Sequence, residues 1–362
     1  MSKTPEPGLD RRDLLAGAAA LGLAAVPLAT AKAQAMPAAK PDDGDNFYKS
    51  DQVAMQAVTF PNQFGMNVAG ALFLPTALDR AARHPAIVVG HPMGAVKEQS
   101  ANLYATKMAE RGFVALSIDL SFWGASEGRP RNAVAPEIYA EDFSAAVDFL
   151  RAQAFVDRER IGAIGVCGSG SFVISAAKID PRIKAVATVS MYDMGSAARN
   201  GLRHGQSLQQ RKALIAAAAQ QRDVEYAGGK TEYVGGTTHQ LTAQTDPIQR
   251  EFFDFYRTPR GEFTPAGSTP LLTTHPTLSS MGKFMNFYPF NDIETISPRP
   301  LMFVTGDVAH SREFSEDAYK RAAEPKDLVI VPGAGHVDLY DRIGLIPWDR
   351  LQGFFAKALA SS

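Results

Sequence analysis

The stretch that decides the fold reads Arg160-Ile161-Gly162-Ala163-Ile164-Gly165-Val166-Cys167-Gly168-Ser169-Gly170-Ser171-Phe172. Its apolar run from Ile161 to Val166 is typical of a short strand that is buried on both faces. Small residues then surround Cys167, with Gly165 two residues before it and Ser169 two residues after it. A side chain at the tip of a strained strand-to-helix turn needs such neighbours, because the two arms of the turn approach closely. The stretch therefore predicts a strand, a sharp turn at Cys167, and a helix.

The spacing Gly165-x-Cys167-x-Ser169 resembles the nucleophile elbow of the α/β-hydrolases, with cysteine where most members have serine, as in dienelactone-hydrolase-like enzymes. A helix that begins near Gly168 would lower the pKa of the thiol through its free N–H groups and its dipole. Two other interpretations compete with this one. Cys167, the only cysteine of the chain, could be a buried and inert thiol. A dinucleotide-binding loop at Gly168-Ser169-Gly170 is disfavoured, because Val173 stands where its third glycine should be.

Strand-like runs alternate with helical patterns on both sides of the elbow. This alternation predicts a mostly parallel sheet with helices on both faces. The resemblance implies the same architecture, an α/β-hydrolase fold built on an eight-stranded sheet. The expected strands are 56–60, 68–74, 85–90, 113–118, 161–166, 183–189, 300–305 and 327–331.

The regular alternation stops between residues 191 and 297. This segment contains two expected helices, 207–226 and 247–256, and a stretch rich in Met, Phe and Tyr. It resembles the cap that many α/β-hydrolases insert over the active site. We therefore expect a hydrolase core of residues 36–190 and 298–362 and a cap of residues 191–297. Phe284 and Phe287 of the cap would line an acyl pocket, although packing of the cap on the sheet would suit them equally well.

The N-terminus predicts export. Arg11-Arg12 precedes an uncharged run rich in Ala, Gly and Leu, and Ala33-x-Ala35 is a cleavage pattern of small residues. We interpret residues 1–35 as a twin-arginine signal peptide, which implies contact with the Tat translocase, a periplasmic or secreted location, and no stable membrane anchor after cleavage. Because four basic and three acidic residues would leave with it, the net charge of −1 would become −2. Such a surface has no large basic footprint for nucleic acid.

A thiol nucleophile needs a base, and the base needs a group that holds its tautomer. His336, in the glycine-rich loop after the last strand, stands where the family has its histidine. The acid is less clearly marked. The residue three positions after Gly306, where the family usually has its acid, is Ala309, so we assign the role to the nearest carboxylate, Asp307, with Asp193 as the alternative.

The loop His91-Pro92-Met93-Gly94 follows a buried strand and resembles the oxyanion loop of the family. Because proline has no N–H, Met93 and Gly168 are the expected oxyanion-hole donors. Phe122 and Trp123 are further candidate pocket walls. The second glycine-serine-glycine pattern, around Ser126, lacks a following strand-turn-helix context and is interpreted as structural.

These residues together predict acyl transfer through a Cys167-His336-Asp307 triad. The expected substrate is a small ester, lactone or thioester, because thiols expel the poor leaving group of an amide badly. No cofactor and no metal are expected, since no two histidines have the i, i+4 spacing of a helical zinc site. Two other functions remain open: a catalytically silent binding protein with a hydrolase fold, and a redox protein that uses Cys167.

Overall fold

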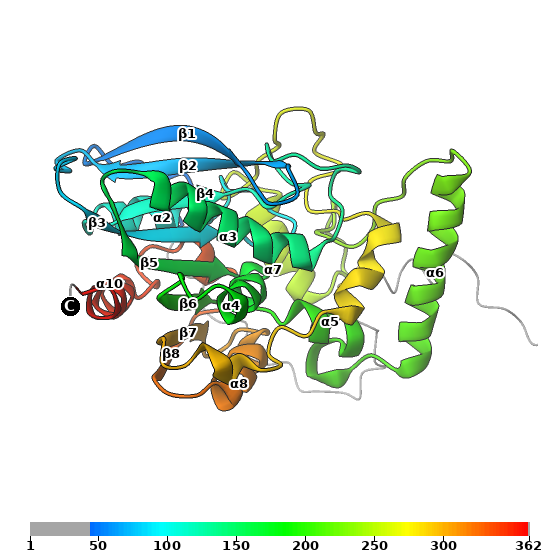
Figure 1. Cartoon of the computed structure of the whole chain (residues 1–362). Coiled ribbons are helices and arrows are strands. Elements are labelled where there is room, and N and C mark those ends of the chain that lie inside the picture. Colours follow the sequence, from blue (N-terminus) through cyan, green and yellow to red (C-terminus); the bar gives the residue numbers. More distant parts are fainter. Residues whose placement is uncertain (1–43, 361–362) are drawn as a thin grey trace, which may run out of the picture.

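The computed structural model describes residues 44–360, so the predicted signal peptide lies outside the described residues. The described chain forms one eight-stranded sheet with helices packed against it (Figure 1). The strands are β1 Val53–Pro61, β2 Asn67–Pro75, β3 His84–Gly90, β4 Val114–Ile118, β5 Val156–Val166, β6 Ala185–Val189, β7 Leu301–Gly306 and β8 Lys326–Val331.

The strand order is β1-β2-β4-β3-β5-β6-β7-β8. β2 pairs antiparallel with both β1 and β4, and every other pairing is parallel. The sheet is therefore mostly parallel and eight-stranded, which confirms the predicted α/β-hydrolase fold. Because the carboxyl ends of parallel strands meet at one edge, the loops after β3, β5, β6 and β7 converge there.

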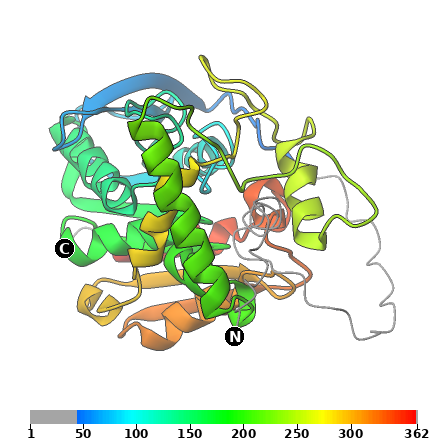
Figure 2. The ribbon, with the colours of Figure 1, turned by 90° about the vertical axis from the view of Figure 1, so that its right-hand side faces the viewer.

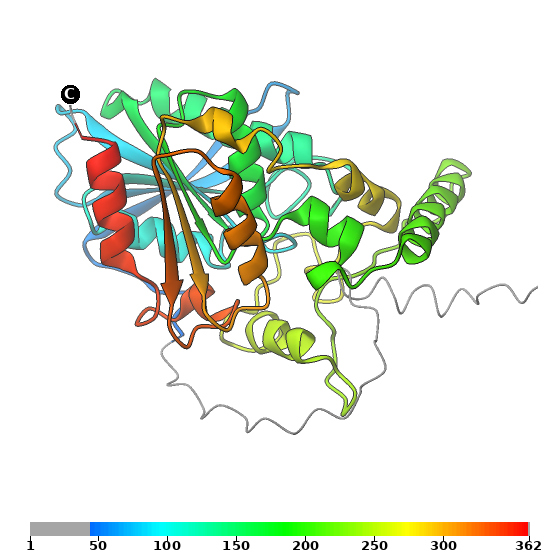
Figure 3. The same cartoon turned by 90° about the horizontal axis from the view of Figure 1, so that it is seen from below.

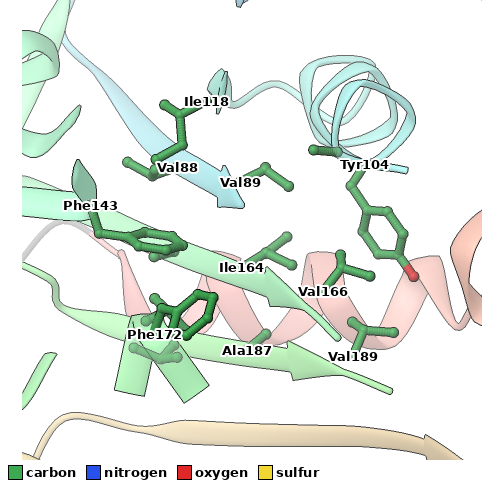
Figure 4. Close-up of a cluster of buried hydrophobic side chains, with 14 of the residues drawn as sticks. Val88, Val89, Tyr104, Ile118, Phe143, Ile164, Val166, Phe172, Ala187 and Val189 are labelled. Carbon is green, nitrogen blue, oxygen red and sulfur yellow. The ribbon is translucent and has the colours of Figure 1, made fainter. Parts of the chain in front are cut away.

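The central strands hold the core. Every residue of β4, β6 and β7 is buried, as their uninterrupted apolar runs predict. Val88 lies on the face of the sheet that carries Phe143 of α3 and Phe172 of α4, and Ile164 lies on the opposite face with Tyr104 of α2 (Figure 4). This packing makes the sheet a rigid base for the loops at its edge.

Helices α2 and α10 cover one face of the sheet, and α3, α4 and α8 cover the other (Figure 3). The rings of Tyr104 on α2 and Trp348 on α10 lie 4.9 Å apart, as do those of Tyr139 on α3 and Phe172 on α4. Within residues 44–360, no helix combines the length and the apolar character needed to cross a bilayer. The helix bounds are α2 Ala101–Ala109, α3 Pro136–Ala152, α4 Ser169–Ile179, α8 Arg312–Arg321, α9 Asp338–Asp341 and α10 Trp348–Ala358.

The segment between β6 and β7 lies beyond the carboxyl ends of the strands (Figure 1). Its longest helix, α6, is the outermost element on that side of the molecule (Figure 2). A shorter helix, α7, carries buried Phe255 and Tyr256 toward the body of the protein. The elements of this segment are α5 Met194–Asn200, η1 Leu202–His204, α6 Leu208–Tyr226, α7 Pro247–Tyr256, η2 Leu278–Asn286 and η3 Ile293–Ile296.

The turn between β5 and α4 depends on a glycine. A Cβ atom added at Gly165 would lie 2.3 Å from the Ser169 carbonyl oxygen and 2.7 Å from the Gly170 nitrogen. Both are backbone atoms of the turn, so neither can move without opening it.

We therefore predict that Gly165→Ala lowers the free energy of unfolding by about 1–3 kcal/mol, the usual cost of overpacking. Gly353→Ala is the matched control, because its added Cβ on α10 would meet nothing within 4 Å. Alanine has the better helix propensity, so the control should be neutral or stabilising by up to about 1 kcal/mol. Urea unfolding measures both changes, and equal stabilities for the two variants would contradict this account of the turn.

Candidate active site

Cys167 occupies the tip of the turn between β5 and α4. Its φ of 53° lies in the left-handed region, which is uncommon for a residue other than glycine and typical of strain at a functional site. Backbone hydrogen bonds hold this conformation: the Cys167 N–H donates to Val189 at 2.9 Å, and its carbonyl accepts from Gly170 and Tyr192. Only 6% of the residue is exposed.

The two expected oxyanion-hole donors lie at the sulfur. The backbone N–H groups of Met93 and Gly168 both donate toward the Cys167 thiol. A Cβ added at Gly168 would lie 3.1 Å from the Met93 nitrogen, which shows how closely the two segments approach. Two N–H groups that converge at a nucleophile can bind the oxyanion of a tetrahedral intermediate.

Burial raises the pKa of the Cys167 thiol to about 11. Hydrogen bonds with Tyr340 and with the N–H groups of Gly168 and Met93 lower the pKa, but by less than burial raises it. The expectation of a lowered pKa at a helix N-terminus was therefore wrong in direction, because loss of water outweighs the helix N-terminus here. At neutral pH the Cys167 thiol is therefore in its neutral form.

His336 lies in the same cluster but does not contact the thiol directly. Its Nε2 is 2.9 Å from the Tyr340 hydroxyl, and its Nδ1 is 2.6 Å from Ser311 Oγ. The Tyr340 hydroxyl in turn hydrogen-bonds with Cys167, so it stands between the thiol and the imidazole. Burial lowers the pKa of His336 well below its usual range, and His310 lowers it further. The resting imidazole is neutral.

Neither expected acid reaches this histidine. Asp307 is exposed, and its Oδ1 accepts the Gly333 N–H at 2.7 Å. Asp193 caps α5 by accepting the Ser196 N–H at 2.7 Å, and burial raises its pKa to about 6. Because both ring nitrogens of His336 are already hydrogen-bonded to hydroxyl groups, the expected hydrogen bond from His336 to Asp307 is not formed. The turn after β7 directs Asp307 outward and brings Ser311 to the ring instead.

Sequence reasoning missed Tyr340, Ser311 and Glu251. Tyr340 follows His336 by four residues, the spacing that places two side chains on one side of a helical turn, and this signal could have identified it. Glu251 is on α7, far from the histidine in sequence. Its Oε2 lies 3.0 Å from His310 Nδ1, and its Oε1 accepts the Val337 N–H at 2.8 Å. No local pattern connects it to the site.

An apolar cavity of about 70 Å³ opens at Cys167. Of the four expected pocket residues, only Phe284 lines it. Phe287 packs against Phe172 of α4 with ring centroids 5.8 Å apart, so it fastens the segment between β6 and β7 to the sheet layer. Other walls come from the loop after β3, from the segment between β6 and β7 and from α9; they include Met93, Tyr192, Ile248, Phe252, Tyr256 and Tyr340.

Phe122 and Trp123 lie outside this cavity. The Phe122 ring covers Gly128, and Trp123 Nε1 donates to the Tyr139 hydroxyl at 2.9 Å. Trp123 lines a second, wider and more polar cavity of about 790 Å³ next to the first. Ser126 holds its loop by donating to the Asp119 carbonyl and accepting from the Ala69 N–H, a structural role. Among residues 44–360, no group of three or more His, Cys, Asp or Glu side chains could hold a metal ion.

The raised thiol pKa predicts how Cys167 reacts with iodoacetamide. Only the thiolate reacts, so alkylation should be slow at pH 7 and rise about tenfold per pH unit toward pH 11. Because folding raises this pKa, the protonated thiol contributes to the stability of the fold below pH ~9, and this contribution is lost as the pH rises to 11. Mass spectrometry measures the labelling, with Cys167→Ser as the unreactive control. A rate that levels off below pH 8 would contradict the burial argument.

Several known proteins are similar to this chain. PA2218 of Pseudomonas aeruginosa is 46% identical over 314 residues, which cover 86% of this chain and 83% of that protein. Its crystal structure superposes with a TM-score of 0.81 over 88% of this chain and 98% of that chain. The thiohydrolase aneE of Aspergillus aculeatus is 28% identical over 294 residues, 79% of this chain and 88% of aneE.

The α/β-hydrolase GrgF from a Penicillium species covers 85% of this chain and all of its own with a TM-score of 0.69. At 20% identity that likeness shows the fold alone. The profile of the dienelactone hydrolase family matches residues 68–234, which include the oxyanion loop and the elbow. These similarities support a hydrolase-type function. The similarity along most of the chain places this protein in one family with PA2218, and the eight-stranded sheet with the family match over residues 68–234 places it in the α/β-hydrolase superfamily, with similarity to the dienelactone hydrolase family.

Proposed function

We propose that the protein hydrolyses acyl thioesters or activated esters, with Cys167 as the nucleophile. The observation that carries this proposal is the convergence of three hydrogen-bonding groups on one thiol. The N–H groups of Met93 and Gly168 and the hydroxyl of Tyr340 all hydrogen-bond with Cys167, and His336 lies directly behind Tyr340. An inert buried cysteine requires neither oxyanion donors nor a path to a base.

The first step is attack on the substrate carbonyl. As the Cys167 sulfur forms its bond to the carbonyl carbon, its proton passes to the Tyr340 oxygen, and the Tyr340 proton passes to His336 Nε2. Tyr340 begins and ends this step as a neutral phenol. Burial raises the pKa of Tyr340 well above its usual value, which keeps the phenol from holding a charge itself. His336 accepts at Nε2 when its Nδ1 hydrogen is donated to Ser311 Oγ.

The tetrahedral intermediate then collapses. The Met93 and Gly168 N–H groups bind its oxyanion, and the proton on His336 returns through Tyr340 to the leaving thiol or alcohol. The acyl group stays on Cys167 as a thioester. Water attacks this thioester, gives up its proton along the same path, and releases the carboxylic acid. The final proton transfer restores the neutral thiol, so atoms and charges balance over the cycle.

The thioester or activated ester class follows from the nucleophile and its pocket. A thiol is itself a good leaving group, so its tetrahedral intermediate expels a thiol or an acidic alcohol more readily than an amine. The cavity at Cys167 is mostly apolar, which suits an acyl chain. The name of the relative aneE, a thiohydrolase, supports the same class.

Cys167→Ala tests the nucleophile. We expect this variant to lose nearly all hydrolysis of p-nitrophenyl acetate and of an acyl thioester, because no other group at the turn can form the acyl intermediate. The thioester assay follows the released thiol. Full activity in the alanine variant would eliminate the proposal, and inactivity of the folded wild-type protein toward every ester and thioester would favour the silent binding protein.

Tyr340→Phe tests the proton path. The phenylalanine ring fills the same space but leaves a gap between Cys167 and His336. We expect kcat to fall about 10²–10⁴-fold, the usual contribution of general acid–base catalysis, while KM changes little. Tyr319→Phe is the matched control, since Tyr319 packs near Lys326 and Phe303, away from the cavity. A Tyr340→Phe enzyme within twofold of wild type would show that His336 reaches the thiol directly.

A further inference from the structure

His336 lacks the carboxylate partner that a catalytic histidine usually has. Ser311 holds its Nδ1, and a hydroxyl can orient the ring but brings no negative charge. Under the proposed mechanism, this fully buried imidazole must become a cation in the transition state. An unpaired charge in such a place is costly, so a compensating charge has to come from elsewhere.

The cap helix α7 brings a carboxylate to the histidine loop. Glu251 Oε1 accepts the N–H of Val337, the residue next to His336, at 2.8 Å. Glu251 Oε2 lies 3.0 Å from His310 Nδ1, and the rings of His310 and His336 are 4.5 Å apart. The carboxylate therefore holds the loop that carries His336. The His310 ring connects it to the His336 imidazole.

The histidine loop is shaped to accept this carboxylate. A Cβ atom added at Gly335 would lie 2.8 Å from Glu251 Oε1, so a larger residue would displace the carboxylate from this position. His310 also leaves its Nε2 buried without a hydrogen-bond partner, while its Nδ1 faces Glu251. Gly335 thus leaves space for the Glu251 carboxylate, and His310 Nδ1 faces it.

We propose that Glu251 of the cap is the positioning residue that replaces the missing acid, stabilising the imidazolium form of His336 from across the boundary between cap and core. This inference rests on the proposed function, because it assigns a role within that reaction. The same helix contributes Ile248, Phe252 and Tyr256 to the acyl cavity. One cap helix thus provides both a wall of the pocket and the charge behind the base, so the base is fully supported only when the cap is seated.

The charges around the site are consistent with this role. Although burial favours the neutral acid, the hydrogen bond and charge of His310 lower the pKa of Glu251 to about 2, so it is ionised at neutral pH. The other titratable groups that face His336 are Cys167, Tyr192, His310 and Tyr340, none of which is an acid ionised at pH 7.

Asp338, which accepts the Gly335 N–H, is the nearest further carboxylate to this loop, and its charge is paired with Arg342. Glu251 is therefore the carboxylate whose charge raises the pKa of the His336 imidazole, against the larger lowering by burial and by His310.

The experiment compares Glu251→Gln with wild type in the full chain. The probe 1,1,1-trifluoroacetone forms a hemithioketal with Cys167, whose oxyanion favours the imidazolium form of His336. The pKa of His336 in this adduct is read by NMR and assigned with His336→Gln. Removing the negative charge should lower this pKa by about one unit. The kcat for p-nitrophenyl acetate should fall by about tenfold or more with little change in KM.

Two further variants complete the test. Asp254→Asn removes an exposed carboxylate from the same helix, where it pairs with Arg260, and should leave both values unchanged. Glu251→Asp keeps the charge and should restore most of the pKa and of kcat; it also serves as the test if the glutamine variant does not fold. An unchanged His336 pKa in folded Glu251→Gln, or a loss in Glu251→Asp equal to that in Glu251→Gln, would overturn the inference. Failure of the wild-type protein to form the adduct would instead overturn the proposed function.

Discussion

The left-handed backbone at Cys167 is the constraint on which the site depends. A φ of 53° is unfavourable for a residue with a Cβ atom, and it persists because strands on both sides hold the turn. The Cys167 N–H is bonded to the end of β6, and Gly165 lets the start of α4 pass close to β5. The strands on both sides, and not the loop itself, thus hold the strained backbone in place. Its result is a thiol presented at the edge where the other loops converge.

Burial determines the protonation states of Cys167 and His336. Loss of water raises the pKa of Cys167 and lowers the pKa of His336, so both rest in their neutral forms. The arrangement therefore resembles a serine–histidine pair in its requirements more than a preformed thiolate–imidazolium pair. It needs a path for the proton, which Tyr340 can provide, and a charge near the base, which Glu251 can provide.

The segment between β6 and β7 belongs to the site as much as the sheet does. It provides most of the cavity wall, and through Glu251 it contacts the backbone of the histidine loop. Phe287 and Phe284 both pack on Phe172 of α4, and Phe284 also lines the cavity. The position of this segment on the core consequently determines the shape of the cavity at Cys167 and the charge near His336.

The sequence by itself determined the local features. The apolar run and glycine spacing around Cys167 predicted the strand and the turn, because both depend on residues adjacent in the chain. His336, Met93 and Gly168 were found from their order after predicted strands. The structure brings Met93 and Gly168 to the Cys167 thiol and His336 to the Tyr340 hydroxyl beside it. Only the tertiary structure decided which side chains surround the base. Asp307 was expected from its position in sequence, but the direction of its side chain depends on the turn after β7, which faces solvent. Glu251 is separated from His336 by the whole distance from α7 to α9, and what joins them is the packing of the cap on the core, a contact between segments that no local sequence pattern encodes.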